Sequence, residues 1–96
     1  MTAFNIVRFK VRRGKDHAFL SAHGPGKVNW PGLQQGTIIK IDEGDYCLIG
    51  EWPDELTLRA ARPVMLATLD TFRDVLVPTD SGVTVAISGQ AVLAIA

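Results

Sequence analysis

The chain has 96 residues, a formal net charge of zero at pH 7 and 47% hydrophobic residues. This length predicts a single domain over residues 1–96, and the balanced charge excludes the basic surface by which proteins bind nucleic acid or an anionic membrane. The apolar runs are also far shorter than a membrane-spanning helix requires.

Cysteine usage points to a reducing compartment. Cys47 is the only cysteine, so no disulfide can form within the chain, and a lone thiol of this kind usually behaves as a small buried hydrophobe. Met1 is followed almost at once by the first predicted strand, which leaves no room for a signal peptide. We therefore expect a cytoplasmic protein.

The first predicted strand covers Phe4–Arg12, where apolar and polar residues alternate. One face is mainly apolar and carries Asn5, Val7, Phe9 and Val11. The other face becomes basic toward its far end. We interpret this basic stretch as a solvated surface, with an anion-binding site as the alternative.

A short helix is predicted over Lys15–His23. Asp16 lies in its first turn, where a negative charge suits the positive end of the helix dipole. His23 follows Phe19 by four residues and therefore shares its inward side. Residues 24–26, Gly-Pro-Gly, end the helix. An irregular connector follows over Lys27–Leu33.

A β-hairpin is predicted over Gly36–Trp52, with a turn at Gly44. Both of its strands carry apolar side chains on both faces, so both faces of the sheet should be covered. The helices of one chain can cover only one face. A homodimer, in which a partner subunit covers the other face, is the simplest solution.

A split helix follows the hairpin. Asp54 is the predicted N-cap and Glu55 starts the first piece. Pro63 interrupts the helix and opens a second piece that ends near Leu76. An apolar stripe runs along this second piece, which we interpret as core, with a cofactor-binding surface as the alternative. The stripe consists of Met65, Leu69, Phe72 and Leu76.

Two further strands are predicted at the C-terminal end. The first covers Val83–Ile87, and Ser88-Gly89 then marks a bend or bulge. The last strand covers Gln90–Ala96 and is apolar to its end. We expect it to pair within the sheet or to reach over a partner subunit.

The order strand, helix, strand, strand, helix, strand is typical of an α+β fold, with a ferredoxin-like antiparallel sheet and helices on one face. This order, the length and the aromatic hairpin end Gly50-Glu51-Trp52 resemble the antibiotic biosynthesis monooxygenase-like family of dimeric α+β barrel proteins. Residues 88–92 also resemble the closing strand of that family. The resemblance implies a homodimeric α+β barrel with a pocket between sheet and helices in each subunit.

The same resemblance implies an activity. Some members of the family are monooxygenases that need no cofactor and act on polycyclic phenols or quinols, and others degrade haem. Many members carry a histidine in the helix after the aromatic strand end. Residues 58–62 contain no histidine, so haem degradation is the weaker alternative, and we expect no cofactor.

Candidate catalytic residues are polar groups expected on apolar faces. On the oxygenase hypothesis His23 is the base, and Asn5 and Arg62 stabilise the anion of the substrate. The alternatives are that His23 interacts with carbonyls at the helix end and that Arg62 is solvated or paired with Glu55 or Asp54. The candidate substrate contacts are Trp52, Trp30, Met65 and Phe72, for which core or interface packing is the alternative.

A metal site is not predicted. His17 and His23 lie six residues apart on one helix and so point in directions about 120° apart, and there is one cysteine. Three hypotheses remain: a cofactor-free oxygenase acting on a small aromatic substrate, a non-catalytic binding module, and a structural dimer. An open cavity lined by both His23 and Arg62 favours the first, an open cavity with neither favours the second, and a filled interior favours the third.

Overall fold

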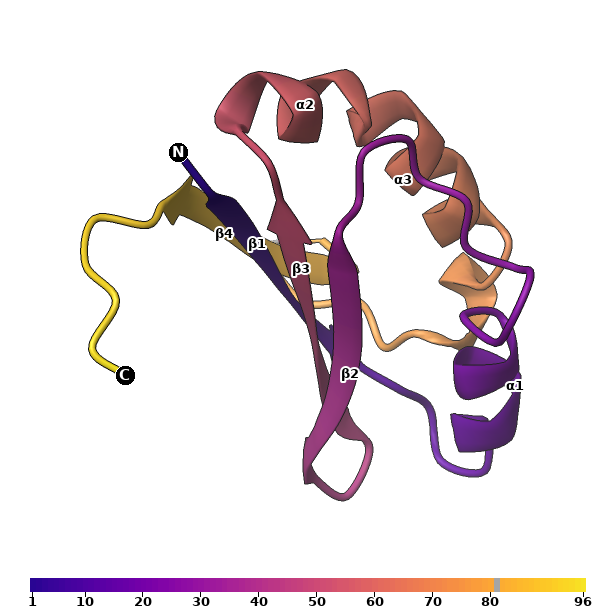
Figure 1. Cartoon of the computed structure of the whole chain (residues 1–96). Coiled ribbons are helices and arrows are strands. Elements are labelled where there is room, and N and C mark those ends of the chain that lie inside the picture. The colour runs from indigo at the N-terminus through magenta and orange to yellow at the C-terminus, as the bar shows by residue number, and fades with distance from the viewer. Residues whose placement is uncertain (81) are drawn as a thin grey trace.

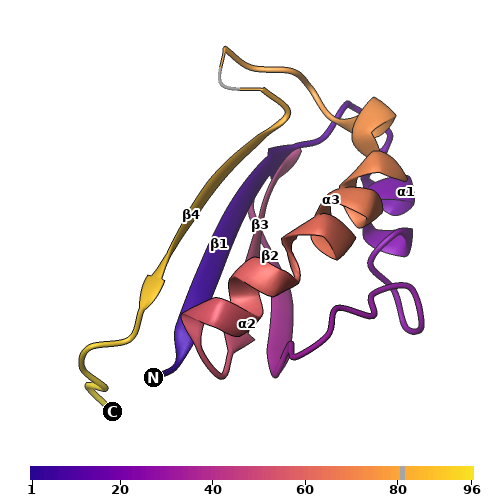
Figure 2. The same ribbon diagram turned by 90° about the horizontal axis from the view of Figure 1, so that it is seen from above.

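The computed structural model describes residues 1–80 and 82–96. Its centre is an antiparallel four-stranded sheet with the strand order β2-β3-β1-β4. All the helices lie on one face of this sheet (Figures 1 and 2). The strands are β1 (Ala3–Lys10), β2 (Gln35–Asp42), β3 (Asp45–Trp52) and β4 (Thr84–Gln90); the helices are α1 (Asp16–Ser21), α2 (Glu55–Ala60), α3 (Arg62–Asp70) and the 3-10 turn η1 (Arg73–Val75). The predicted ferredoxin-like α+β fold is confirmed.

The core lies between the sheet and the helices. Alternation along β1 and β3 directs one set of side chains inward, and the register places Val7 opposite Leu48 and Phe9 opposite Tyr46. The largest fully buried side chains are Trp52, Phe19, Leu58 and Leu76. The predicted inward face of the first strand is therefore confirmed.

The predicted break in the long helix is confirmed as well. The Asp54 side chain accepts a hydrogen bond of 2.7 Å from the backbone N–H of Thr57 and so caps α2. Pro63 lies in the first turn of α3, where its missing N–H removes no helical bond. At the break the chain changes direction, so that α2 runs across the top of the view and α3 descends from it (Figure 1).

The second helical piece is shorter than predicted. It ends at Asp70, and η1 follows over Arg73–Val75, so the prediction of a helix to Leu76 was wrong. The Thr71 hydroxyl donates to the Thr68 carbonyl over 2.6 Å, and Phe72 leaves helical geometry at φ −133°. Phe72 and Leu76 of the apolar stripe are buried all the same.

Other predicted ends also shift inward. The first strand ends at Lys10, since Val11 forms only an isolated bridge with Leu76. The first helix covers Asp16–Ser21, which leaves His23 in the turn that follows.

The predicted C-terminal strand was wrong. β4 continues to Gln90, and Ser88 and Gly89 pair with β1 in unbroken register, so there is no bulge at this point. Residues 91–96 lie outside any strand, because β1 begins at Ala3 and offers Ala91 only the Thr2 carbonyl, 2.8 Å away. This tail leaves the sheet in Figure 1.

The face of the sheet opposite the helices, which we call the open face, carries exposed apolar side chains. Ile39 is 43% exposed and Ile87 is 65% exposed, and Ile6, Ile41 and Val85 are also exposed. In contrast, Cys47 is buried, as predicted. Within the described part of the chain, no helix is both long and apolar enough to cross a membrane.

Candidate functional site

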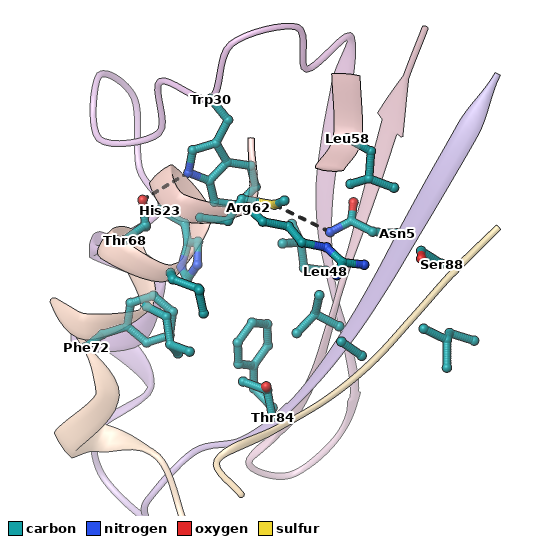
Figure 3. Close-up of a pocket in the computed structure, with 17 residues that line it drawn as sticks. Asn5, His23, Trp30, Leu48, Leu58, Arg62, Thr68, Phe72, Thr84 and Ser88 are labelled. Atoms are coloured by element: carbon teal, nitrogen blue, oxygen red, sulfur yellow. Dashed lines mark hydrogen bonds between the residues drawn. The ribbon is translucent and has the colours of Figure 1, made fainter. Parts of the chain in front are cut away.

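A cavity of about 420 Å³ lies between the helices and the central strands (Figure 3). It is large enough for a small organic molecule, for which such sites usually measure about 300–1,000 Å³. Its walls are mostly apolar side chains from β1, β3, β4, α2 and α3. The polar or titratable residues among those that line it are Asn5, His23, Trp30, Arg62, Thr68, Thr84 and Ser88.

Asn5 presents an amide at the wall formed by β1. Its side chain is buried, and its Oδ1 accepts a hydrogen bond of 2.8 Å from Trp52 Nε1. That bond fixes which way the amide points, so the Nδ2 group is turned toward Met65, whose sulfur lies 3.7 Å away. Because a thioether is a weak acceptor, Asn5 keeps donor capacity for a stronger acceptor in the cavity.

Gly50 makes this arrangement possible. It lies opposite Asn5 in the pairing of β1 with β3. A Cβ atom at Gly50 would clash with Asn5 Oδ1 and would lie 3.0 Å from Trp52 Nε1. In the sequence, Gly50 was noted only as part of a family resemblance. That it leaves room for Asn5 was not predicted.

Trp52 lies behind the cavity wall and not in it. It is fully buried and is not among the residues that line the cavity. Trp52 was expected to stack on a ligand, but the structure does not place it where it could do so. Trp52 orients the Asn5 side chain instead. Its ring packs parallel to that of Trp30, with centroids 6.5 Å apart and planes 11° apart.

Trp30 joins the connector to the helices. Its Nε1 donates to Thr68 Oγ1 on α3 over 2.9 Å, and its ring lines the cavity. The sequence analysis missed Thr68. Its spacing gives the signal, because it lies three residues after Met65 and four before Phe72, on the same side of the helix.

His23 lines the cavity among aromatic rings. Its ring centroid lies 4.6 Å from that of Phe72 and 5.0 Å from that of Phe19. Its Nδ1 lies 3.0 Å from the Phe19 carbonyl oxygen, which can only accept, so Nδ1 carries the proton. The alternative in which His23 interacts with a carbonyl at the helix end is therefore what the structure shows, and the ring also lines the cavity.

Burial lowers the pKa of His23 below its ordinary value, and the hydrogen bond to Phe19 opposes that shift. His23 is therefore neutral at pH 7. With the proton on Nδ1, the lone pair is on Nε2, for which the described residues provide no hydrogen-bond partner. A neutral imidazole with a free lone pair can accept a proton.

Arg62 lies at the cavity rim and is exposed to solvent. Of the two alternatives given for Arg62, the structure shows the solvated one, because neither Glu55 nor Asp54 pairs with it. The Glu55 carboxylate instead bonds to Arg59 at 2.9 Å and to Gln90 at 3.1 Å, and that of Asp54 caps α2. Among residues 1–80 and 82–96, Arg62 forms no ion pair or hydrogen bond through its side chain.

Met65 and Phe72 line the cavity as expected. The sequence analysis missed the contributions of β4, Thr84 and Ser88, whose alternation with Ala86 on the inward face was a usable signal. The structure thus brings together Asn5, His23, Trp30, Arg62, Met65 and Phe72 around one cavity and leaves Trp52 behind it.

In the basic part of the first strand, Arg8 is already paired with an acid, which argues against the alternative of an anion-binding site there. Arg8 pairs with Asp45 at 2.6 Å on the open face, and this bond raises the pKa of Arg8 and lowers that of Asp45. In the described part of the chain, no three or more His, Cys, Asp or Glu side chains are grouped so that they could hold a metal ion.

No protein-family model matches the sequence, and no curated protein matches it. Solved structures with the same fold do match over nearly the whole chain. A protein from Nitrosomonas europaea, provisionally named an antibiotic biosynthesis monooxygenase, is 18% identical at a TM-score of 0.75, covering 94% of this chain and 89% of its own.

Two further structures agree. SnoaB from Streptomyces nogalater, a cofactor-independent oxygenase, is 16% identical at a TM-score of 0.70, covering 98% of this chain and 96% of its own. Rv0793 from Mycobacterium tuberculosis is 17% identical at a TM-score of 0.72, covering 100% of both chains. The chain therefore has the fold of the antibiotic biosynthesis monooxygenase-like proteins, and the resemblance is confirmed at the level of the fold.

Proposed function

We propose that the chain binds a small apolar aromatic compound, a quinol or a polyketide-like phenol, in this cavity and oxidises it with molecular oxygen without a cofactor. The observation that carries the proposal is the presence of a neutral, partly buried His23 and the Asn5 amide in the lining of one mostly apolar cavity. The cofactor-independent oxygenase SnoaB, which has the same fold, supports it.

The protein has few tasks in such a reaction. His23 Nε2 takes the proton of a phenolic hydroxyl, which leaves an electron-rich anion. The charge spreads through the ring to a second oxygen or carbon, and the Nδ2 group of Asn5 donates a hydrogen bond to it. His23 and Asn5 lie on different walls of the cavity (Figure 3), as two groups that contact opposite ends of one conjugated ring system must.

The substrate supplies every electron. For a phenol whose keto tautomer has a ring methylene, the net reaction of that tautomer is CH₂ + O₂ → C=O + H₂O, which places one oxygen atom on carbon and releases the other as water. The anion transfers an electron to oxygen, the two radicals recombine at carbon, and loss of water from the hydroperoxide leaves the carbonyl. Apolar walls help because they keep water away from the anion and the hydroperoxide.

The unfilled cavity argues against a purely structural role, since Asn5, Met65 and Phe72 border the space without closing it. A non-catalytic binding module with the same cavity is the second candidate, because Arg62 and the apolar walls serve binding whether or not chemistry follows. Oxygen consumption separates the two functions.

We propose in addition that the chain forms a homodimer through the open face. Exposed apolar side chains there come from β1, β2 and β4 together, including Ile6, Ile39 and Ile87. An apolar patch that spans several strands is typical of a protein interface. A symmetric dimer covers two such faces with one contact.

The test begins with thermal denaturation against aromatic quinols, polyketide-like phenols and haem. A ligand at a hundred times its dissociation constant stabilises the fold by about 2.7 kcal/mol, a shift of several degrees. Oxygen uptake is then followed with each compound that binds. We expect His23→Gln and Asn5→Leu to reduce the rate about a hundredfold.

His17→Gln is the matched control, because His17 is exposed, lies in the same helical region, has Nε2 3.3 Å from the Ser21 hydroxyl and does not line the cavity. It should keep the full rate. Binding without oxygen uptake would favour the binding module. A shift with none of the compounds would contradict both functions.

A further inference from the structure

Arg62 has no evident structural role. Among the described residues that line the cavity, Arg62 alone carries a formal charge at pH 7, since His23 is neutral there. Its side chain forms no ion pair in the described part of the chain, and the nearby Glu55 and Asp54 are bonded elsewhere. An unpaired cation at the mouth of an apolar cavity favours an anion there.

The position of Arg62 also distinguishes it from the groups assigned to the chemistry. Asn5 is buried and His23 is partly buried, whereas Arg62 is exposed at the rim. A charge that develops inside an apolar cavity is best stabilised by donors that are also shielded from water. An exposed guanidinium is better suited to a group that stays at the mouth throughout the reaction.

We propose that Arg62 is a specificity residue that binds a carboxylate on the ligand, so that the preferred ligand is an aromatic acid. The proposal rests on the proposed function, since it takes the same cavity as the ligand site. A guanidinium holds a carboxylate through two parallel hydrogen bonds. Arg62 supplies one positive charge. A carboxylate matches it with one negative charge, whereas a phosphate dianion carries two.

The geometry gives the ligand an orientation. In Figure 3 the guanidinium end of Arg62 reaches from α3 toward the strands, on the side of Asn5 and Ser88. A carboxylate held there leaves the ring to enter between the apolar walls, toward His23. In this proposal Arg62 selects and orients the ligand and takes no part in the proton transfer, which differs from the role in stabilising the reacting anion that the sequence predicts for it.

The test compares a dihydroxyanthraquinone carboxylic acid with its primary amide, by titration calorimetry at pH 7. Both compounds are quinones and already oxidised, so binding is measured without turnover. We expect the acid to bind wild-type protein about ten times more tightly than the amide. This preference should shrink at high salt, because the charge is exposed.

Arg62→Gln should abolish the preference by weakening acid binding and leaving amide binding unchanged. Arg62→Lys should keep part of it, since the charge remains and the two-pronged geometry is lost. Arg59→Gln is the matched control: Arg59 is three residues away, pairs with Glu55 at 2.9 Å and does not line the cavity. It should retain the full preference.

Equal binding of acid and amide by wild-type protein, or a preference that survives in Arg62→Gln, would overturn this proposal and leave the proposed function standing. Failure of both compounds to bind would overturn the assignment of the cavity itself, and this proposal with it. An unchanged melting temperature of Arg62→Gln confirms that a loss of preference is not a loss of fold.

Discussion

Both faces of the sheet carry apolar side chains, which are mostly buried on the helix-covered face and mostly exposed on the open face. On the helix-covered face, Phe9, Leu48 and Trp52 are buried, and the polar groups there have partners, as the Asn5–Trp52 bond shows. On the open face, Ile39 and Ile87 are exposed within the single chain. The helices of the same chain cover the first face, and in the proposed dimer a partner subunit covers the second.

The two sets of side chains that alternate along one strand therefore have different roles. Along β3, alternate residues face the helices and determine how the chain folds and what the cavity holds. The residues between them face outward and determine what the chain associates with. Substitutions on the two faces should therefore fail in different ways, one in folding and the other in assembly.

The largest effect is expected on the open face. In a symmetric dimer Ile39→Asp places two unpaired carboxylates in the interface, and burying an unpaired charge costs about 3–5 kcal/mol. The dissociation constant should rise at least about a thousandfold. Sedimentation should show wild-type dimer and variant monomer, with the circular dichroism of the fold retained. A monomeric wild-type protein would contradict the dimer.

The next effect is expected on the covered face. Trp52→Ala should lower the free energy of unfolding by about 3–5 kcal/mol, because it removes a fully buried aromatic side chain. Trp52→Phe keeps most of the packing but leaves Asn5 Oδ1 without its partner, and should cost about 1–3 kcal/mol. Urea denaturation measures both. Equal costs would mean that the hydrogen bond, and not the packing, dominates.

A smaller effect is expected at Gly50. Gly50→Ala forces its Cβ against Asn5 Oδ1, and such overpacking costs about 1–3 kcal/mol. The displaced Asn5 should also reduce ligand binding. Gly89→Ala in β4 is the matched control, because its Cβ would meet no atom within 4 Å. A Gly50→Ala variant as stable as the control would show that Asn5 can move without penalty.

Much of the fold could be predicted from the sequence because its signals are local. Alternation identified β1, and two β-rich runs around the turn at Gly44 identified the hairpin. Asp54 identified the start of α2, and Pro63 identified the break before α3. The tail over residues 91–96 could not be predicted in the same way. Its apolar residues favour a strand, but a strand needs an unpaired neighbour, and β1 has no residues left at that point.

The sequence predicted several residues of the site but not how they are arranged. Asn5, His23 and Arg62 stood out as polar groups on apolar faces, and all of them line the cavity. That Trp52 lies behind Asn5 depends on a register between strands that are distant in sequence, which no local pattern specifies. The bond between Trp30 and Thr68 likewise joins an irregular connector to a helix.

The smallest effect is expected in the pH dependence of stability. Burial lowers the pKa of folded His23, while in the unfolded chain it stays near 6.5. Below that pH the unfolded chain binds a proton that the folded chain does not, so the free energy of unfolding falls as the pH falls through the folded pKa. Melting temperatures measured from neutral to acidic pH should show this decline.

His23→Gln should flatten that part of the profile, even though the loss of its ring contacts with Phe19 and Phe72 lowers the melting temperature overall. His17→Gln is the control histidine, because His17 is exposed and does not line the cavity, and the decline due to His23 should persist in it. A decline of the same size in His23→Gln would mean that other groups carry it and that the fold does not lower the pKa of His23. Burial would then do nothing to favour the neutral imidazole, which is the form that can accept a proton.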